Sequence, residues 1–239
     1  MRFDRISTPL VTPCHADLAL NADALAETVE MLIAAGVHGI IGAGTTGDYD
    51  AQSPEERVDP MRRVRALGAG RVPVIVGIGA MRTEESIAHA EAAREAGADA
   101  LLIATPPYAV PTGREIALHA LVVDRAANLP VMLCNHPGRT GVNMDAAYLD
   151  RLGRSPRLCA IEESSGVPHR LHMRARDYPR IRLGCGMDDE APEFFAQGGA
   201  VPGLRRLQLR ARGAPRCGVP ARWRAISRRG ARSCPRCCR

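Results

Sequence analysis

Lysine is absent from this sequence, because all 32 basic residues of the 239-residue chain are arginine. An arginine guanidinium stays protonated and cannot act as the neutral amine that attacks a carbonyl carbon. Catalysis through the side-chain amine of a lysine is therefore excluded for this chain, wherever its active site lies.

Long apolar runs are also missing. No stretch of eighteen consecutive apolar residues occurs, and the opening segment MRFDRISTPLVTP has no basic-then-apolar leader pattern. A membrane-spanning helix needs such a run, and an export signal needs such a pattern. We therefore expect a soluble, cytoplasmic protein with no membrane contact. Hydrophobic residues make up 46% of the chain, which is enough to build a sizeable core.

Negative charge is missing from the last part of the chain. Positions 201–239 hold twelve arginines and no Asp or Glu, which leaves 20 basic against 26 acidic residues in positions 1–200. An asymmetry of this size indicates an appended tail. We expect one domain over residues 1–199, followed by a tail over residues 200–239 that is disordered or is out-of-frame translation of a GC-rich gene.

Two functional interpretations of the tail stay open beside that one. Its unopposed arginines would permit electrostatic binding to nucleic acid, and Cys234, Cys237 and Cys238 resemble half of a zinc site. The simpler interpretations are a solvated charge run and chance cysteines, because Cys217 has no second cysteine at matching spacing. We therefore expect neither a metal nor nucleic acid as a partner.

Short β-branched runs alternate with amphipathic helical stretches along the first 199 residues, which is typical of a parallel sheet covered by helices. Seven such units with short loops favour a (β/α)8 barrel without its eighth unit. An open doubly wound sheet is disfavoured, because no GxGxxG follows the first strand. The expected strands are 7–12, 37–43, 72–78, 98–104, 131–134, 159–162 and 181–185. The expected helices are 22–35, one from 53 onward, 84–96, 114–127, 145–153, 168–177 and one from 189 onward.

Two of these strands end in polar motifs that would share one pocket, because a barrel places its chemistry at the carboxyl ends of its strands. The motifs are VMLCNHPGRTG at 131–141 and CAIEESSG at 159–166. They resemble the YNxPxRTG and xIKExSG motifs of the dihydrodipicolinate synthase and N-acetylneuraminate lyase family, and the resemblance covers residues 3–198. It implies a TIM barrel without a cofactor that forms dimers or tetramers. It also implies a lyase that joins or splits pyruvate and an aldehyde through a lysine imine.

The resemblance extends to further residues of the pocket. GTTGD resembles the family's GTTGE, whose threonines bind the pyruvate carboxylate and take part in a proton relay, which assigns these roles to Thr45 and Thr46. Tyr108 in TPPYA is similar to a relay tyrosine that a neighbouring subunit supplies. Arg139 matches an arginine that helps to hold the substrate carboxylate, as its planar fork allows. Gly186 in GCGMDD resembles a glycine turn beside the pocket, although a plain tight turn is an equal alternative.

Two positions depart from the family pattern. Cys134 stands at the position of the relay tyrosine, and Glu162 stands at the position of the lysine that forms the imine with pyruvate. A thiol is shorter than a phenol, and a carboxylate would repel the charge of a keto acid. We therefore expect a lyase of this family that is impaired or inactive as written. The alternatives are a non-catalytic keto-acid-binding protein, a metal-dependent aldolase using Cys134, His136 and Glu162, and a nucleic-acid binder acting through the tail.

Overall fold

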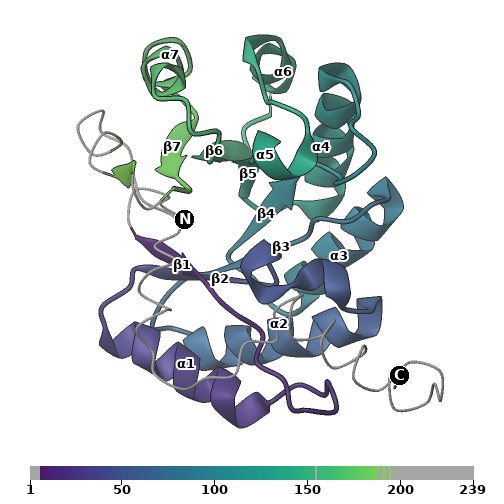
Figure 1. Ribbon diagram of the computed structural model, residues 1–239, viewed down its shortest axis with the longest axis vertical. Coiled ribbons are helices and arrows are strands. Elements are labelled where there is room, and N and C mark those ends of the chain that lie inside the picture. The colour runs from purple at the N-terminus through teal and green to yellow at the C-terminus, as the bar shows by residue number, and fades with distance from the viewer. Residues whose placement is uncertain (1–5, 154, 188–189, 192–193, 195–239) are drawn as a thin grey trace, which may run out of the picture.

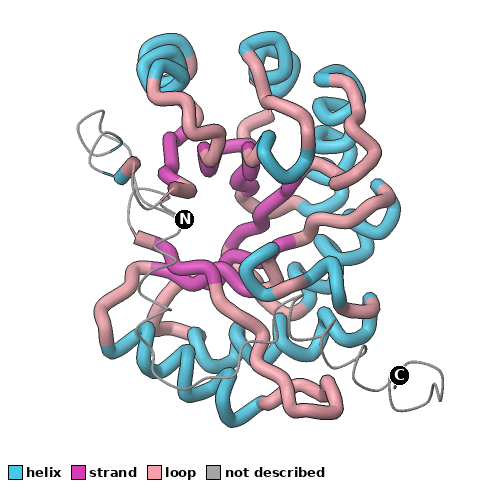
Figure 2. Tube along the Cα trace, viewed as in Figure 1, coloured by secondary structure: helices cyan, strands magenta, loops and turns pink. Residues whose placement is uncertain are grey.

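The protein folds as a parallel, curled sheet with helices on its outer face. This computed structural model describes residues 6–153, 155–187, 190–191 and 194. The strands are β1 (Ser7–Pro9), β2 (Gly39–Gly42), β3 (Val74–Gly77), β4 (Ala100–Ala104), β5 (Val131–Asn135), β6 (Leu158–Glu163) and β7 (Arg182–Cys185). They pair in parallel in chain order from β1 to β7. The helices between them lie along the outer side of the curled sheet in Figures 1 and 2. The TIM-barrel prediction is confirmed.

Local capping signals mark the starts and ends of several helices. They are α1 (Ala22–Ala34), α2 (Pro54–Gly68), α3 (Thr83–Glu95), α4 (Gly113–Ala127), α5 (Pro137–Thr140), α6 (Ala146–Leu152) and α7 (His169–Asp177), with two 3-10 turns, η1 (Thr45–Gly47) and η2 (Tyr49–Ala51). Asn21 caps α1, and Ser53 with Glu56 forms a capping box on α2, which satisfies backbone N–H groups that lack partners within the helix. Gly36 and Gly97 follow α1 and α3 at positive φ, a conformation that glycine adopts without strain.

The two faces of the sheet bury side chains of different kinds. Outward-facing residues such as Ile40, Val76 and Leu133 pack against the helices in the larger core cluster. The inward face holds a smaller cluster of Ile41, Ile75, Ala100, Leu102, Met132 and Ala160. Since side chains alternate between the two faces of a strand, this division leaves the inner side free for polar residues at the carboxyl ends of the strands.

The structure differs from the sequence-based expectations mainly at boundaries. The first strand is three residues long instead of six, and the segment after β5, expected to be a loop, contains the single-turn helix α5. The helix expected from residue 189 onward and the tail over 200–239 fall almost wholly outside the described residues. Within the described part, β1 and β7 are the end strands of the sheet, and no helix is long and apolar enough to cross a membrane.

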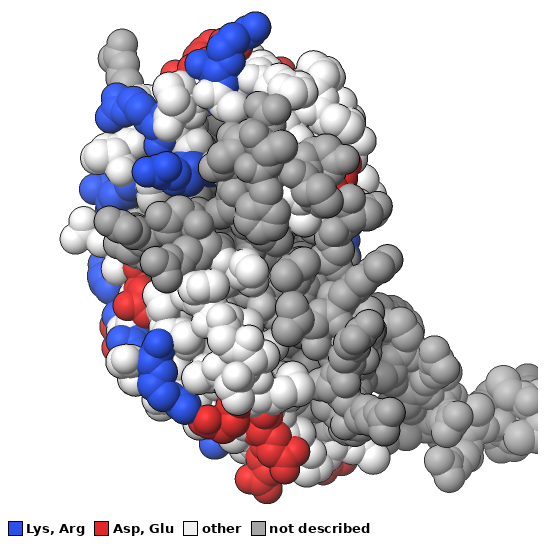
Figure 3. All heavy atoms as spheres, turned by 90° about the vertical axis from the view of Figure 1, so that its left-hand side faces the viewer, with Lys and Arg blue, Asp and Glu red and all other residues white. Residues whose placement is uncertain are grey.

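The described surface carries charges of both signs. Figure 3 shows the side of the molecule that lies at the left of Figure 1, with arginines along its upper part and acidic side chains at its base. Positions 1–200 as a whole hold 20 basic and 26 acidic residues. The basic net charge of the chain therefore comes from the composition of residues 201–239.

Candidate functional site

A cavity of about 350 Å³ lies at the carboxyl ends of the strands. Its walls come from the ends of β1 to β6 and from the segments that follow them, including η1, η2 and α5. Such a position is where barrels of parallel strands carry their chemistry. The lining residues that bear polar or ionisable side chains are Thr45, Thr46, Asp48, Tyr49, Asp50, Thr105, Cys134, His136, Arg139, Thr140, Glu162 and Ser164.

Five of the seven site residues predicted from the sequence line this cavity. They are Thr45, Thr46, Cys134, Arg139 and Glu162. The threonines sit on η1 after β2, and the arginine sits on α5 after β5. Residues that are up to 117 positions apart in the chain are thus brought to one cavity by the curl of the sheet. Their roles in binding or catalysis stay predictions.

The other two predicted residues lie beside the cavity or away from it. The backbone of Gly186 packs against the pocket wall, because a Cβ there would overlap Oγ of Ser164 and would lie 2.9 Å from Oε1 of Glu162. A larger residue at this position would have to displace the side chains of Ser164 and Glu162. Tyr108 is 90% exposed, has a positive φ of 69°, and does not line this chain's cavity.

The two residues that depart from the family pattern are direct neighbours. Cys134 and Glu162 are register partners in the pairing of β5 with β6, and both side chains are half-buried and face the cavity. A thiol and a carboxylate therefore share one patch of the wall, at the positions where the family resemblance expects a phenol and an amine. A carboxylate accepts hydrogen bonds and attracts cations, so this patch favours a ligand group that donates hydrogen bonds.

Tyr49 is a pocket residue that the sequence analysis missed. It lies on η2, its side chain is buried, and the guanidinium of Arg57 stacks over its ring at 4.7 Å from the centroid. Arg57 also donates hydrogen bonds to the carbonyl oxygens of Gly79 (2.8 Å) and Gly77 (3.1 Å). Burial raises the pKa of Tyr49, so its phenol is protonated and available as a donor. The only sequence signal was an aromatic residue directly after the GTTGD motif.

Burial also affects the pKa of Arg57, lowering it to about 10. The guanidinium stays charged at neutral pH, because that value lies well above 7. It therefore joins the ring of Tyr49 to the end of β3 through a cation–π contact and two charge-assisted hydrogen bonds. Tyr49 is held against the strand end rather than being free to rotate.

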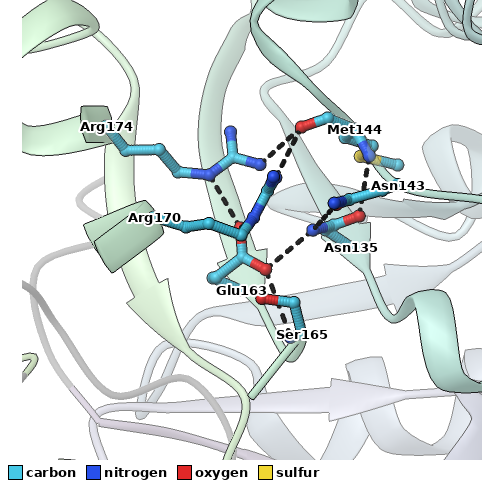
Figure 4. A network of polar contacts seen from close by, with 7 residues as sticks. All are labelled: Asn135, Asn143, Met144, Glu163, Ser165, Arg170 and Arg174. Carbon is cyan, nitrogen blue, oxygen red and sulfur yellow. Dashed lines mark hydrogen bonds and ion pairs between the residues drawn. The ribbon is translucent and has the colours of Figure 1, made fainter. Parts of the chain in front are cut away.

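A buried ionic network lies on the outer side of β5 and β6, behind the pocket wall (Figure 4). The Glu163 carboxylate accepts hydrogen bonds from Nε of Arg174 (2.7 Å), Nδ2 of Asn135 (2.7 Å) and the backbone N–H of Ser165 (3.2 Å). It also forms an ion pair with Arg170 at 3.5 Å. The side chains of Glu163 and Arg174 are 1% and 2% exposed. This network ties the end of β6 to helix α7.

The same network reaches the segment before α6. The carbonyl oxygen of Met144 accepts hydrogen bonds from Arg170 (2.8 Å) and Arg174 (2.7 Å). Asn135 accepts a hydrogen bond from the N–H of Met144 (2.9 Å) and donates one to Oδ1 of Asn143 (2.9 Å). Because Asn135 and Glu163 directly follow the two pocket residues of β5 and β6, the network holds both strand ends in place.

The metal-dependent alternative is not supported by the geometry. Over the part of the chain that the structure describes, no three His, Cys, Asp or Glu side chains form a group that can hold a metal ion. Cys134, His136 and Glu162 line the same cavity without forming such a group.

Comparisons with known proteins agree with the fold. The sequence profile of the dihydrodipicolinate synthetase family matches residues 2–202. The chain is 38% identical over 187 residues to 4-hydroxy-tetrahydrodipicolinate synthase of Cellvibrio japonicus, covering 78% of this chain and 60% of that protein. It is 39% identical over 191 residues to the synthase of Methylococcus capsulatus, covering 80% and 66%. The chain thus spans about two thirds or less of these relatives.

A solved structure with the same fold contains a ligand. Dihydrodipicolinate synthase from Acinetobacter baumannii, complexed with pyruvate, superposes with a TM-score of 0.80 at 30% identity. The match covers 85% of this chain and 70% of that one.

Proposed function

Because the chain belongs to the dihydrodipicolinate synthetase family, we propose that its cavity is a site for a small keto acid such as pyruvate whose covalent chemistry is lost. In this proposal Arg139, Thr45 and Thr46 hold the ligand carboxylate. The main support for this proposal is that the cavity contains residues of the family motifs, while position 162 is glutamate and the chain has no lysine. The chain as written then binds its ligand without forming an imine.

A second copy of the chain completes the proposed site. Tyr108 is 90% exposed and lies outside this chain's own cavity. The family resemblance assigns it to the pocket of a neighbouring subunit, and its exposure is compatible with that role. The proposal therefore includes a homo-oligomer in which Tyr108 is covered by a partner copy.

Borohydride trapping tests the loss of the nucleophile. In the Glu162→Lys variant, the new amine would add to C2 of pyruvate and release water, and borohydride would reduce the imine to a stable secondary amine. We expect mass spectrometry to find this adduct on residue 162 of the variant and no adduct on a side chain of the unmodified protein.

A matched control introduces one lysine at a position outside the pocket. Arg114 is exposed near the start of α4, so Arg114→Lys supplies an accessible amine of the same kind at a position that no pocket surrounds. It should remain unlabelled under the same conditions. If Glu162→Lys also stays unlabelled, or if Arg114→Lys is labelled equally, the cavity is not a pyruvate site.

A further inference from the structure

The carboxylate of Glu162 is held in the cavity wall. Its residue lies in the interior of the β5–β6 pairing, in register with Cys134. The backbone of Gly186 packs against its side chain, at a spacing where a Cβ would be 2.9 Å from both Cγ and Oε1. The adjacent residue Glu163 is fixed on the outer side by the buried arginines of α7. The position of the Glu162 backbone is thus determined from both faces of the sheet.

Groups of the opposite character come from other parts of the same cavity. Thr45 and Thr46 follow β2, which lies across the curled sheet from β6 in Figure 1. Arg139 lies on α5, beyond the end of β5. Hydroxyl and guanidinium groups donate hydrogen bonds to a carboxylate. The cavity therefore offers donors for an anionic group and, on β6, an acceptor for a cationic one.

The half-buried carboxylate of Glu162 in the cavity wall favours a ligand that carries a cationic group over a plain anion. The acidic lining residues are Asp48, Asp50 and Glu162, and the arginine among the lining residues is Arg139. A keto acid brings one more negative charge and no hydrogen-bond donor for Glu162. An α-amino acid brings the same carboxylate together with an ammonium group on the neighbouring carbon, so its net charge is zero.

From these observations we infer that the cavity selects a small α-amino acid over the corresponding keto or hydroxy acid, with Glu162 accepting hydrogen bonds from the ligand ammonium. This inference rests on one part of the proposed function, the carboxylate site formed by Arg139, Thr45 and Thr46. The exchange of lysine for glutamate then does more than remove a nucleophile. It places a carboxylate where the family resemblance expects the lysine amine, and this carboxylate would pair with an ammonium group of the ligand.

The test compares ligands that share one skeleton. Alanine, lactate and pyruvate each carry a carboxylate and a methyl group, and they differ in the ammonium, hydroxyl or keto group on the central carbon. Isothermal titration calorimetry with the full chain should find alanine binding at least about tenfold more tightly than lactate or pyruvate, as expected for one charge-assisted hydrogen bond. Both enantiomers of alanine and of lactate are measured.

Two variants test which residues cause the preference for alanine. Glu162→Gln keeps the side-chain volume and removes the charge, so the alanine-to-lactate ratio should fall to within about threefold. Arg139→Gln should weaken alanine and lactate by similar factors, because both ligands keep their carboxylate. Far-UV circular dichroism checks that each variant is folded. If a variant does not fold, the comparison of ligands in the unmodified protein still tests the preference for alanine.

The outcomes separate this inference from the proposed function. If Glu162→Lys forms the pyruvate adduct but the unmodified protein binds alanine no better than lactate, the keto-acid site stands and the amino-acid preference is refuted. If alanine is preferred and Glu162→Gln abolishes the preference, while Glu162→Lys forms no adduct, the amino-acid site stands and the pyruvate proposal fails. A preference that survives in Glu162→Gln also overturns the assignment to Glu162.

Discussion

Replacing Glu163 with glutamine is expected to destabilise the protein by about 3–5 kcal/mol, the usual cost of removing one partner from a buried ion pair. The carboxylate lies 2.7 Å from Nε of Arg174 and 3.5 Å from Arg170, and these two side chains are 2% and 8% exposed. Glutamine keeps the volume and one acceptor oxygen. Its amide N–H donors would, however, face either the guanidinium groups or the N–H donors of Asn135 and Ser165, and none of these groups is an acceptor.

The magnitude is large compared with the total stability of a domain, which is typically about 5–15 kcal/mol. Urea unfolding followed by far-UV circular dichroism measures this loss of stability. The urea concentration at the midpoint should fall, while the dependence of the unfolding free energy on urea concentration stays unchanged. A loss below about 1 kcal/mol would refute the reasoning, because it would mean that both guanidinium groups reach water once their partner is gone.

Glu162→Gln is the matched control for this measurement. The substitution is the same and the residue is the next one along the same strand, but its side chain is half-buried and faces the cavity. Its charge is partly solvated, so the change in unfolding free energy should stay within about 1 kcal/mol. Equal losses in both variants would indicate that the effect comes from the strand rather than from the buried network.

Two further predictions concern the supporting structure. Burial lowers the pKa of His89 from 6.5 to about 4, so the stability present above pH 6.5 is lost as the pH falls towards 4, by up to about 3 kcal/mol. In His89→Gln the urea midpoint should therefore change less with pH over this range. A midpoint that varies with pH as strongly as in the unmodified protein would contradict this. Gly77→Ala should cost about 1–3 kcal/mol in urea unfolding, because its Cβ would overlap the Ala43 carbonyl oxygen, whereas Gly113→Ala, with open space around it, should be neutral or slightly stabilising.

The repeating units of the fold were predictable because their signals are local. Asn21 and the Ser53–Glu56 pair mark helix starts by hydrogen bonds to residues three positions away. Gly36 marks a helix end by its own φ. Strand ends were less certain, as for β1, because pairing with β2 decides how far an extended segment counts as a strand.

The candidate-site residues that belong to sequence motifs could be predicted. Thr45, Thr46 and Arg139 reach one cavity, as expected from their place after parallel strands. Tyr49 was missed, because its place in the wall depends on Arg57 and on contacts with β3 more than twenty residues away. Tyr108 was expected to serve the pocket of a neighbouring subunit, and this role stays a prediction, because the structure shows only that it lies outside the cavity of its own chain.

Composition and local pattern alone determined the alternation of strands and helices, the family resemblance, and the exclusion of a lysine nucleophile. The last of these holds in any fold, because a chemical group that is absent cannot act. The tertiary structure alone decided that Cys134 and Glu162 stand side by side, that Gly186 packs against Glu162, and that Glu163 turns away to two buried arginines. These contacts depend on the register and curvature of the sheet, since adjacent residues of one strand face opposite sides of it.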